Sequence, residues 1–147
     1  MADSAESTSS LSRFSADYCG GSRCALLFEN CVSANKQTVE KYLDGFRRSD
    51  HSLVLSCLTE DVEWVIPGAF HLVGKAAFDA EIENPAFVGS PIIETTRIVE
   101  EGDVVVAEGS VRANRADGGI LNAVFCDVFL MRGGLIRHLT SYLMELE

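Results

Sequence analysis

Two polar side chains lie within otherwise apolar patterns of this sequence, and both could donate a hydrogen bond inside a cavity. Asp127 stands in the middle of the run ILNAVFCDVFLM. If this run is a strand, alternation places Asp127 on the same face as Phe125 and Phe129. Burial penalises a carboxylate, so we expect Asp127 to be protonated, hydrogen-bonded or next to a polar cavity. A core aspartate satisfied by a neighbouring group would produce the same pattern.

Tyr42 is the second such side chain. It shares an apolar stripe with Val39, Leu43 and Phe46, and this spacing predicts a helix over residues 36–48 whose apolar face packs on a sheet. A buried tyrosine hydroxyl needs a partner. If Tyr42 and a neutral Asp127 face the same interior, they form a site that donates hydrogen bonds to a carbonyl or enolate oxygen. A core tyrosine with a satisfied hydroxyl is the alternative.

The elements that follow this helix are short. Asp50 or Ser52 can cap a second helix that ends near Thr59. Residues 62–66 are rich in β-branched and aromatic side chains and stop at Pro67-Gly68, which predicts a short strand. We expect a loop next, and then a third short helix over residues 75–82.

The last third of the chain has the pattern of a β-meander. Glycine-containing turns separate four extended runs, at residues 92–100, 104–114, 120–131 and 135–146. Because helices come first and strands follow, the expected fold class is α+β, with a cone-shaped, curved antiparallel sheet wrapped over the N-terminal helices in a single domain.

The first 34 residues differ from the rest in composition. They contain eight serines and three of the five cysteines, Cys19, Cys24 and Cys31, and show no sustained period. We therefore predict a poorly ordered extension over residues 1–34 and one folded domain over residues 35–147. The cysteine spacing contains no C-x-x-C pair, which favours reduced thiols in a cytoplasmic protein. Neither the cysteines nor the histidines have metal-ligand spacing, so we expect no metal and no cofactor.

Composition restricts the partners of the protein. A chain of 147 residues has room for one domain, and its net charge of −10 argues against binding to nucleic acid or to an anionic membrane. The apolar runs are too short for a membrane-spanning helix. We expect instead a small apolar molecule and a second copy of the chain, because the run 120–131 is apolar on both faces.

Three segments carry a resemblance to a known family: TVEKYLDGFRRSDHSLVLSCLTEDVEWVIPG, LVGK and FCDVFLMRGGLIRHLTSY. Over about residues 35–146 the chain resembles the nuclear transport factor 2-like superfamily, especially its SnoaL-like and ketosteroid-isomerase-like branches. The resemblance implies a cone-shaped α+β barrel, a deep apolar pocket and, commonly, a homodimer.

The resemblance also implies roles for particular residues. Tyr42 stands at the position of the family's oxyanion-hole tyrosine, and Asp127 at that of its protonated aspartic acid. The general-base aspartate of the isomerases would fall at Ile66, which cannot move a proton. His71, expected at the pocket rim, could take that catalytic role. The expected ligand-binding residues are Phe46, Trp64, Ile66, Phe125, Phe129, Leu139 and Ser141.

Two functions remain open on this basis. The first is an enzyme of the isomerase, cyclase or dehydratase type that uses the Tyr42 and Asp127 oxyanion site. The second is a non-catalytic ligand-binding or dimerisation module of the same fold, which the isoleucine at the base position favours.

Overall fold

The computed structural model describes residues 32–147, and its elements follow the predicted order except for one strand, β2. The expected extension over residues 1–34 lies outside the described residues up to Cys31, whereas Ser33 and Ala34 already belong to the start of a helix. In chain order the elements are α2 (Ala34–Arg48), α3 (His51–Leu55), β1 (Leu58–Ile66), β2 (Phe70–Val73), α4 (Lys75–Ile82), β3 (Phe87–Glu101), β4 (Val104–Arg115), β5 (Ile120–Arg132) and β6 (Leu135–Glu145).

The strands form one open six-stranded sheet in the order β2-β1-β6-β5-β4-β3. Four pairs are antiparallel, but β1 runs parallel to β6, so the sheet is mixed where an antiparallel sheet was expected. The segment expected as a loop after Pro67-Gly68 is the edge strand β2. A tight turn, in which the amide of Ala69 donates to the carbonyl of Ile66 at 2.9 Å, folds it back on β1.

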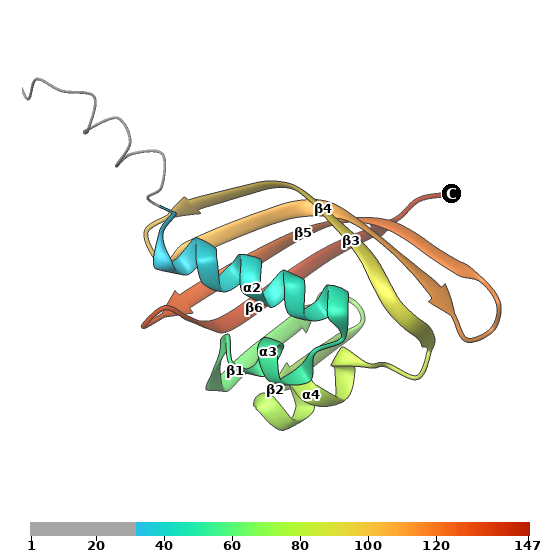
Figure 1. The fold of residues 1–147 in the computed structure, drawn as a ribbon, viewed down its shortest axis with the longest axis horizontal. Coiled ribbons are helices and arrows are strands. Elements are labelled where there is room, and N and C mark those ends of the chain that lie inside the picture. The colour runs from blue at the N-terminus through green and yellow to red at the C-terminus, as the bar shows by residue number, and fades with distance from the viewer. Residues whose placement is uncertain (1–31) are drawn as a thin grey trace, which may run out of the picture. The chain divides into compact units, whose positions relative to one another are not determined.

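Helix α2 lies across the concave side of the sheet (Figure 1). It begins two residues earlier than expected, because the hydroxyl of Ser33 accepts a hydrogen bond from the amide of Lys36 at 3.1 Å and caps the helix. Its buried face contains Val39, Tyr42 and Leu43, as the apolar stripe predicted. The guanidinium of Arg47 fixes the C-terminal end by donating to the carbonyl of Ile93 at 2.8 Å.

The two shorter helices lie near β1 and β2 (Figure 1). Asp50 caps α3 by accepting a hydrogen bond from the amide of Leu53. The helix ends at Leu55, before the expected Thr59, because β1 already begins at Leu58. None of the helices within residues 32–147 has the length and apolar character needed to span a membrane.

The curvature of the sheet has a local cause. The pairing of β3 with β4 shifts register twice, between Val88 and Ile92 and between Thr95 and Arg97. Such bulges bend a strand and increase its twist. Gly109 lies opposite the second shift, and a Cβ there would stand 2.0 Å from the carbonyl oxygen of Glu94. The bend therefore depends on a residue without a side chain.

Candidate active site

An apolar cavity lies between α2 and the sheet. Its inner part has a volume of about 110 Å³ and is lined by Tyr42, Leu43, Phe46, Trp64, Ile66, Ile93, Val111, Phe125, Asp127, Ser141 and Leu143. An outer part of about 410 Å³ adjoins it and shares six of these residues. The polar residues differ in exposure between the two parts, since Tyr42, Asp127 and Ser141 are buried whereas Glu83 and Ser90 of the outer part are exposed. A ligand would thus enter past α4 and reach the polar groups last.

Asp127 is the only acidic residue that lines the inner part, and it is 8% exposed. Among the ion pairs of residues 32–147, none includes Asp127. Burial raises the pKa of its carboxyl to about 7, against the smaller opposing effect of a hydrogen bond from Ser141. Near neutral pH, both the acid and the carboxylate are therefore populated, and the acid can donate a hydrogen bond.

Tyr42 approaches the same space from α2. Its ring is 3% exposed and is held by Phe46, Phe78 and Phe129, whose ring centroids lie 5.0, 6.2 and 5.4 Å away. Burial raises the pKa of the Tyr42 hydroxyl well above its ordinary value, and the charge of Asp127 raises it further. The hydroxyl therefore keeps its proton and is a second donor at the inner end.

Trp64, on β1, forms another part of the cavity wall. Its ring stacks on Phe78 with the centroids 4.6 Å apart and the planes 24° from parallel. Its indole nitrogen donates to the hydroxyl of Ser141 over 3.1 Å. Both residues are thereby held by neighbours other than a ligand, which preorganises this side of the cavity.

Seven of the ten site residues predicted from the sequence line the inner part: Tyr42, Phe46, Trp64, Ile66, Phe125, Asp127 and Ser141. Phe129 and Leu139 do not contribute to the lining. They are 0% exposed and belong to the core beneath Tyr42. The strands that carry them continue past the cavity under α2, so inward orientation alone does not bring a side chain to the cavity.

His71 also lies outside the cavity. It is on β2, where alternation turns Phe70 toward the cavity and His71 toward the other face. There its Nε2 atom stands 2.9 Å from a carboxylate oxygen of Glu63, and its side chain is 55% exposed. The structure therefore gives His71 no access to a ligand beside Asp127.

Several polar residues of the outer part were not predicted. The amide of Asn84 donates to Glu81 at 2.8 Å, and the hydroxyls of Ser49 and Ser90 are 3.0 Å apart. They come together only because α4 and the start of β3 pack beside the end of α2, which no local pattern indicates. Within the described part of the chain, no group of three or more His, Cys, Asp or Glu residues is arranged to hold a metal ion.

Comparison with known proteins identifies the family. A model of the SnoaL-like domain matches residues 39–139, which include both Tyr42 and Asp127. The chain belongs to the SnoaL-like family. No curated protein sequence matches this SnoaL-like chain.

Solved structures show the same fold. An NTF2-like protein of unknown function from Burkholderia pseudomallei has a TM-score of 0.71 at 23% identity, over 77% of this chain and 92% of its own. TerC, co-crystallised with polyporic acid, has a TM-score of 0.67 at 24% identity, over 74% and 90% of the two chains. A candidate ketosteroid isomerase from Kribbella flavida has a TM-score of 0.65 at 18% identity, over 78% of this chain and 80% of its own. At these identities the likeness establishes the NTF2-like fold of the SnoaL-like domain.

Proposed function

We propose that this SnoaL-like protein binds a small, largely apolar molecule by its carbonyl or phenol oxygen and carries out acid–base chemistry on it, of the isomerase, cyclase or dehydratase type. One observation carries the proposal: Tyr42 and Asp127 both line the inner part of a mostly apolar cavity. Each is a proton donor in its neutral form, and burial favours that form in both. Two donors in a water-poor site stabilise negative charge that develops on an oxygen atom.

The proton that leaves carbon needs a separate acceptor. Ile66 lines the cavity at the position where the related isomerases have a carboxylate base, and His71 is on the other face of the sheet. In the inner part of the cavity, bound water is left to accept the proton. We therefore expect slow proton transfer compared with an enzyme that has a dedicated base.

The ketone 2-tetralone tests this proposal, because its α-protons are removed through an enolate. We expect the protein to accelerate α-proton exchange in D2O, as followed by proton NMR. Asp127→Ala and Tyr42→Phe should each slow the catalysed exchange at least about tenfold, the effect of losing one oxyanion donor. Exchange at the rate of the buffer alone would contradict catalysis.

A non-catalytic ligand-binding module is the second candidate, and the side chain of Ile66 favours it. In that case 2-tetralone binds in the cavity, and its affinity still depends on Tyr42 and Asp127, but exchange is not accelerated. Binding by isothermal titration calorimetry and exchange by NMR on the same samples separate the two functions.

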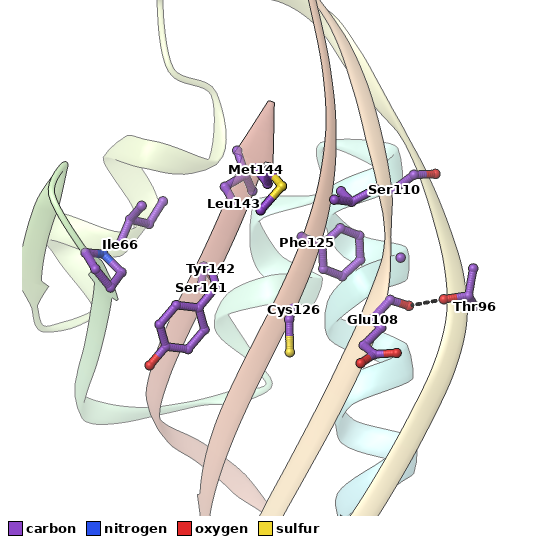
Figure 2. A pocket seen from close by; sticks show the side chains of 13 residues that line it. Ile66, Thr96, Glu108, Ser110, Phe125, Cys126, Ser141, Tyr142, Leu143 and Met144 are labelled. Carbon is purple, nitrogen blue, oxygen red and sulfur yellow. Dashed lines mark hydrogen bonds between the residues drawn. The ribbon is translucent and has the colours of Figure 1, made fainter. Parts of the chain in front are cut away.

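We further propose that the outer face of the sheet forms a homodimer. A groove of about 680 Å³ crosses this face, where β6 contributes Tyr142 and Met144, β5 contributes Cys126 and β4 contributes Glu108 (Figure 2). Tyr142 is 54% exposed and Met144 67% exposed. Exposed apolar side chains gathered on one surface are typical of a protein interface.

The dimer can be tested by charge insertion. Met144→Lys should shift sedimentation at micromolar concentration from dimer to monomer. Ala80→Lys is the control, because Ala80 is exposed but lies on α4, which packs against Trp64 on the cavity side of the sheet. A wild-type protein that sediments as a monomer contradicts this proposal.

A further inference from the structure

Three cavity residues come from three neighbouring strands. Trp64 is on β1, Ser141 on β6 and Asp127 on β5, in the sheet order β1-β6-β5. The indole nitrogen of Trp64 donates to the Ser141 hydroxyl over 3.1 Å. Asp127 is the direct cross-strand partner of Ser141, and both residues line the same cavity.

The direction of these hydrogen bonds follows from the chemistry of the groups. An indole N–H can only donate, so Ser141 must accept from Trp64. The proton of the Ser141 hydroxyl then needs an acceptor, because this residue is 4% exposed. The carboxyl of Asp127 provides one. Ser141 therefore donates to one carboxyl oxygen, and the acid proton of Asp127 is placed on the other oxygen.

We propose that Trp64 and Ser141 are positioning residues: they form a one-way hydrogen-bond chain that holds the proton of Asp127 on the carboxyl oxygen available to a ligand. The inference rests on the proposed function, since it explains which carboxyl oxygen of Asp127 carries the proton that a ligand meets. Polarisation by the indole makes Ser141 a better donor than an isolated serine. Ser141 and Trp64 thus act on the ligand through Asp127, beyond lining the cavity.

The experiment measures the pKa of Asp127 by carbon-13 NMR of its carboxyl, in protein without ligand. Ser141→Ala removes the donor that stabilises the carboxylate, so the pKa of Asp127 should rise by roughly one unit. Trp64→Phe keeps an aromatic ring but removes the N–H, so the pKa should rise by a smaller amount. In Ser141→Ala combined with Trp64→Phe, the rise should equal that of Ser141→Ala alone, because the chain is already broken.

Two further variants separate positioning from structure. Ser141→Thr keeps the hydroxyl and should leave the pKa near the wild-type value. Tyr142→Phe removes an exposed hydroxyl from the neighbouring position and should also leave it unchanged. The inference is overturned if Ser141→Ala does not move the pKa, or if Trp64→Phe moves it as much in the Ser141→Ala background as in the wild type.

Failure of this inference is distinguishable from failure of the proposed function. The titration uses no ligand, whereas the function is tested by exchange and binding in the wild type. If Asp127 keeps its pKa in Ser141→Ala while the wild type still accelerates α-proton exchange in 2-tetralone, the hydrogen-bond chain is wrong and the proposed function stands. If the pKa moves as expected but no ligand binds, the chain stands and the function is wrong.

Discussion

The Tyr42 hydroxyl on α2 and the Asp127 carboxyl on β5 line the same small cavity, close enough that the charge of Asp127 raises the pKa of Tyr42. Two acids that disfavour each other's ionisation stay protonated more readily than either alone. The pair is thus suited to donating hydrogen bonds to one ligand oxygen. The remaining lining is mostly apolar, which limits the ligands to molecules with a large apolar body.

Asp127 should make the protein less stable as the pH rises. The folded state keeps the Asp127 proton up to about pH 7, whereas the unfolded chain releases it near the ordinary value of 3.8. The folded state therefore binds more protons across this window, and the free energy of unfolding falls as the pH rises through it. A shift of this size corresponds to about 4 kcal/mol.

Urea unfolding at pH 5 and pH 8 checks this prediction. Asp127→Asn cannot ionise, so the free energy of unfolding of this variant should fall less between the two pH values than that of the wild type. An equal fall in both proteins would show that Asp127 ionises at its ordinary pKa.

His51 should add to this fall in stability with rising pH. Its Nδ1 atom is 2.6 Å from Asp79 and its Nε2 atom 3.1 Å from Glu83, both on or just after α4. The hydrogen bonds that the His51 ring donates to these two carboxylates raise the pKa of His51. Protonated His51 donates to both, whereas the neutral ring has only one N–H. The contribution is therefore full below the unfolded pKa and is lost as the pH rises through the folded pKa.

The variant His51→Gln tests whether the hydrogen bonds from His51 to Asp79 and Glu83 stabilise the fold. Its melting temperature should be lower than that of the wild type at pH 5.5 and nearly equal to it at pH 8.5. Arg48, which pairs with Asp44 at 2.9 Å on α2, offers the control Arg48→Gln, whose effect should not change with pH over this range. A difference in melting temperature between His51→Gln and the wild type that is the same at both pH values would contradict this role of His51.

Gly109 should tolerate no side chain. A Cβ at this position would meet the carbonyl oxygen of Glu94 and the ring of Phe125, at 2.0 and 2.8 Å. We expect Gly109→Ala to lower the free energy of unfolding by about 1–3 kcal/mol, the usual cost of overpacking. Ser110→Ala, at the next residue of β4, should change it by less than about 0.5 kcal/mol. Similar losses in the two variants would contradict the close approach of Gly109 to the backbone of Glu94.

Phe129 and Phe125 should respond differently to the same substitution. Phe129→Leu should lower the free energy of unfolding by about 1–2 kcal/mol, because Phe129 is buried in the core. It should leave the affinity for 2-naphthol, a phenol with the shape of the 2-tetralone enol, within about twofold of the wild-type value. Phe125→Leu should weaken binding several-fold, because Phe125 lines the cavity. Calorimetric titration of both variants checks this. A larger loss of affinity in Phe129→Leu than in Phe125→Leu would indicate that the ligand binds deeper in the core than the cavity extends.

Periodicity alone was enough to place Tyr42 and Asp127. The helical stripe fixed the face of Tyr42, and alternation along β5 fixed that of Asp127, because each element buries one side over its whole length. The same logic fails for His71, since a four-residue edge strand next to a turn is too short to give a period. It also fails for Glu81 and Ser90, which both line the outer part only because of tertiary packing.

Binding of 2-naphthol is the most direct test of the central claim, that Tyr42 and Asp127 jointly donate to one ligand oxygen. This phenol has the shape of the 2-tetralone enol and carries a single oxygen. At pH 6 we expect Tyr42→Phe and Asp127→Ala each to raise the dissociation constant about tenfold, with Tyr142→Phe unchanged. Wild-type affinity should also fall as the pH rises through 7, where Asp127 loses its proton. An affinity that neither substitution changes would contradict the claim.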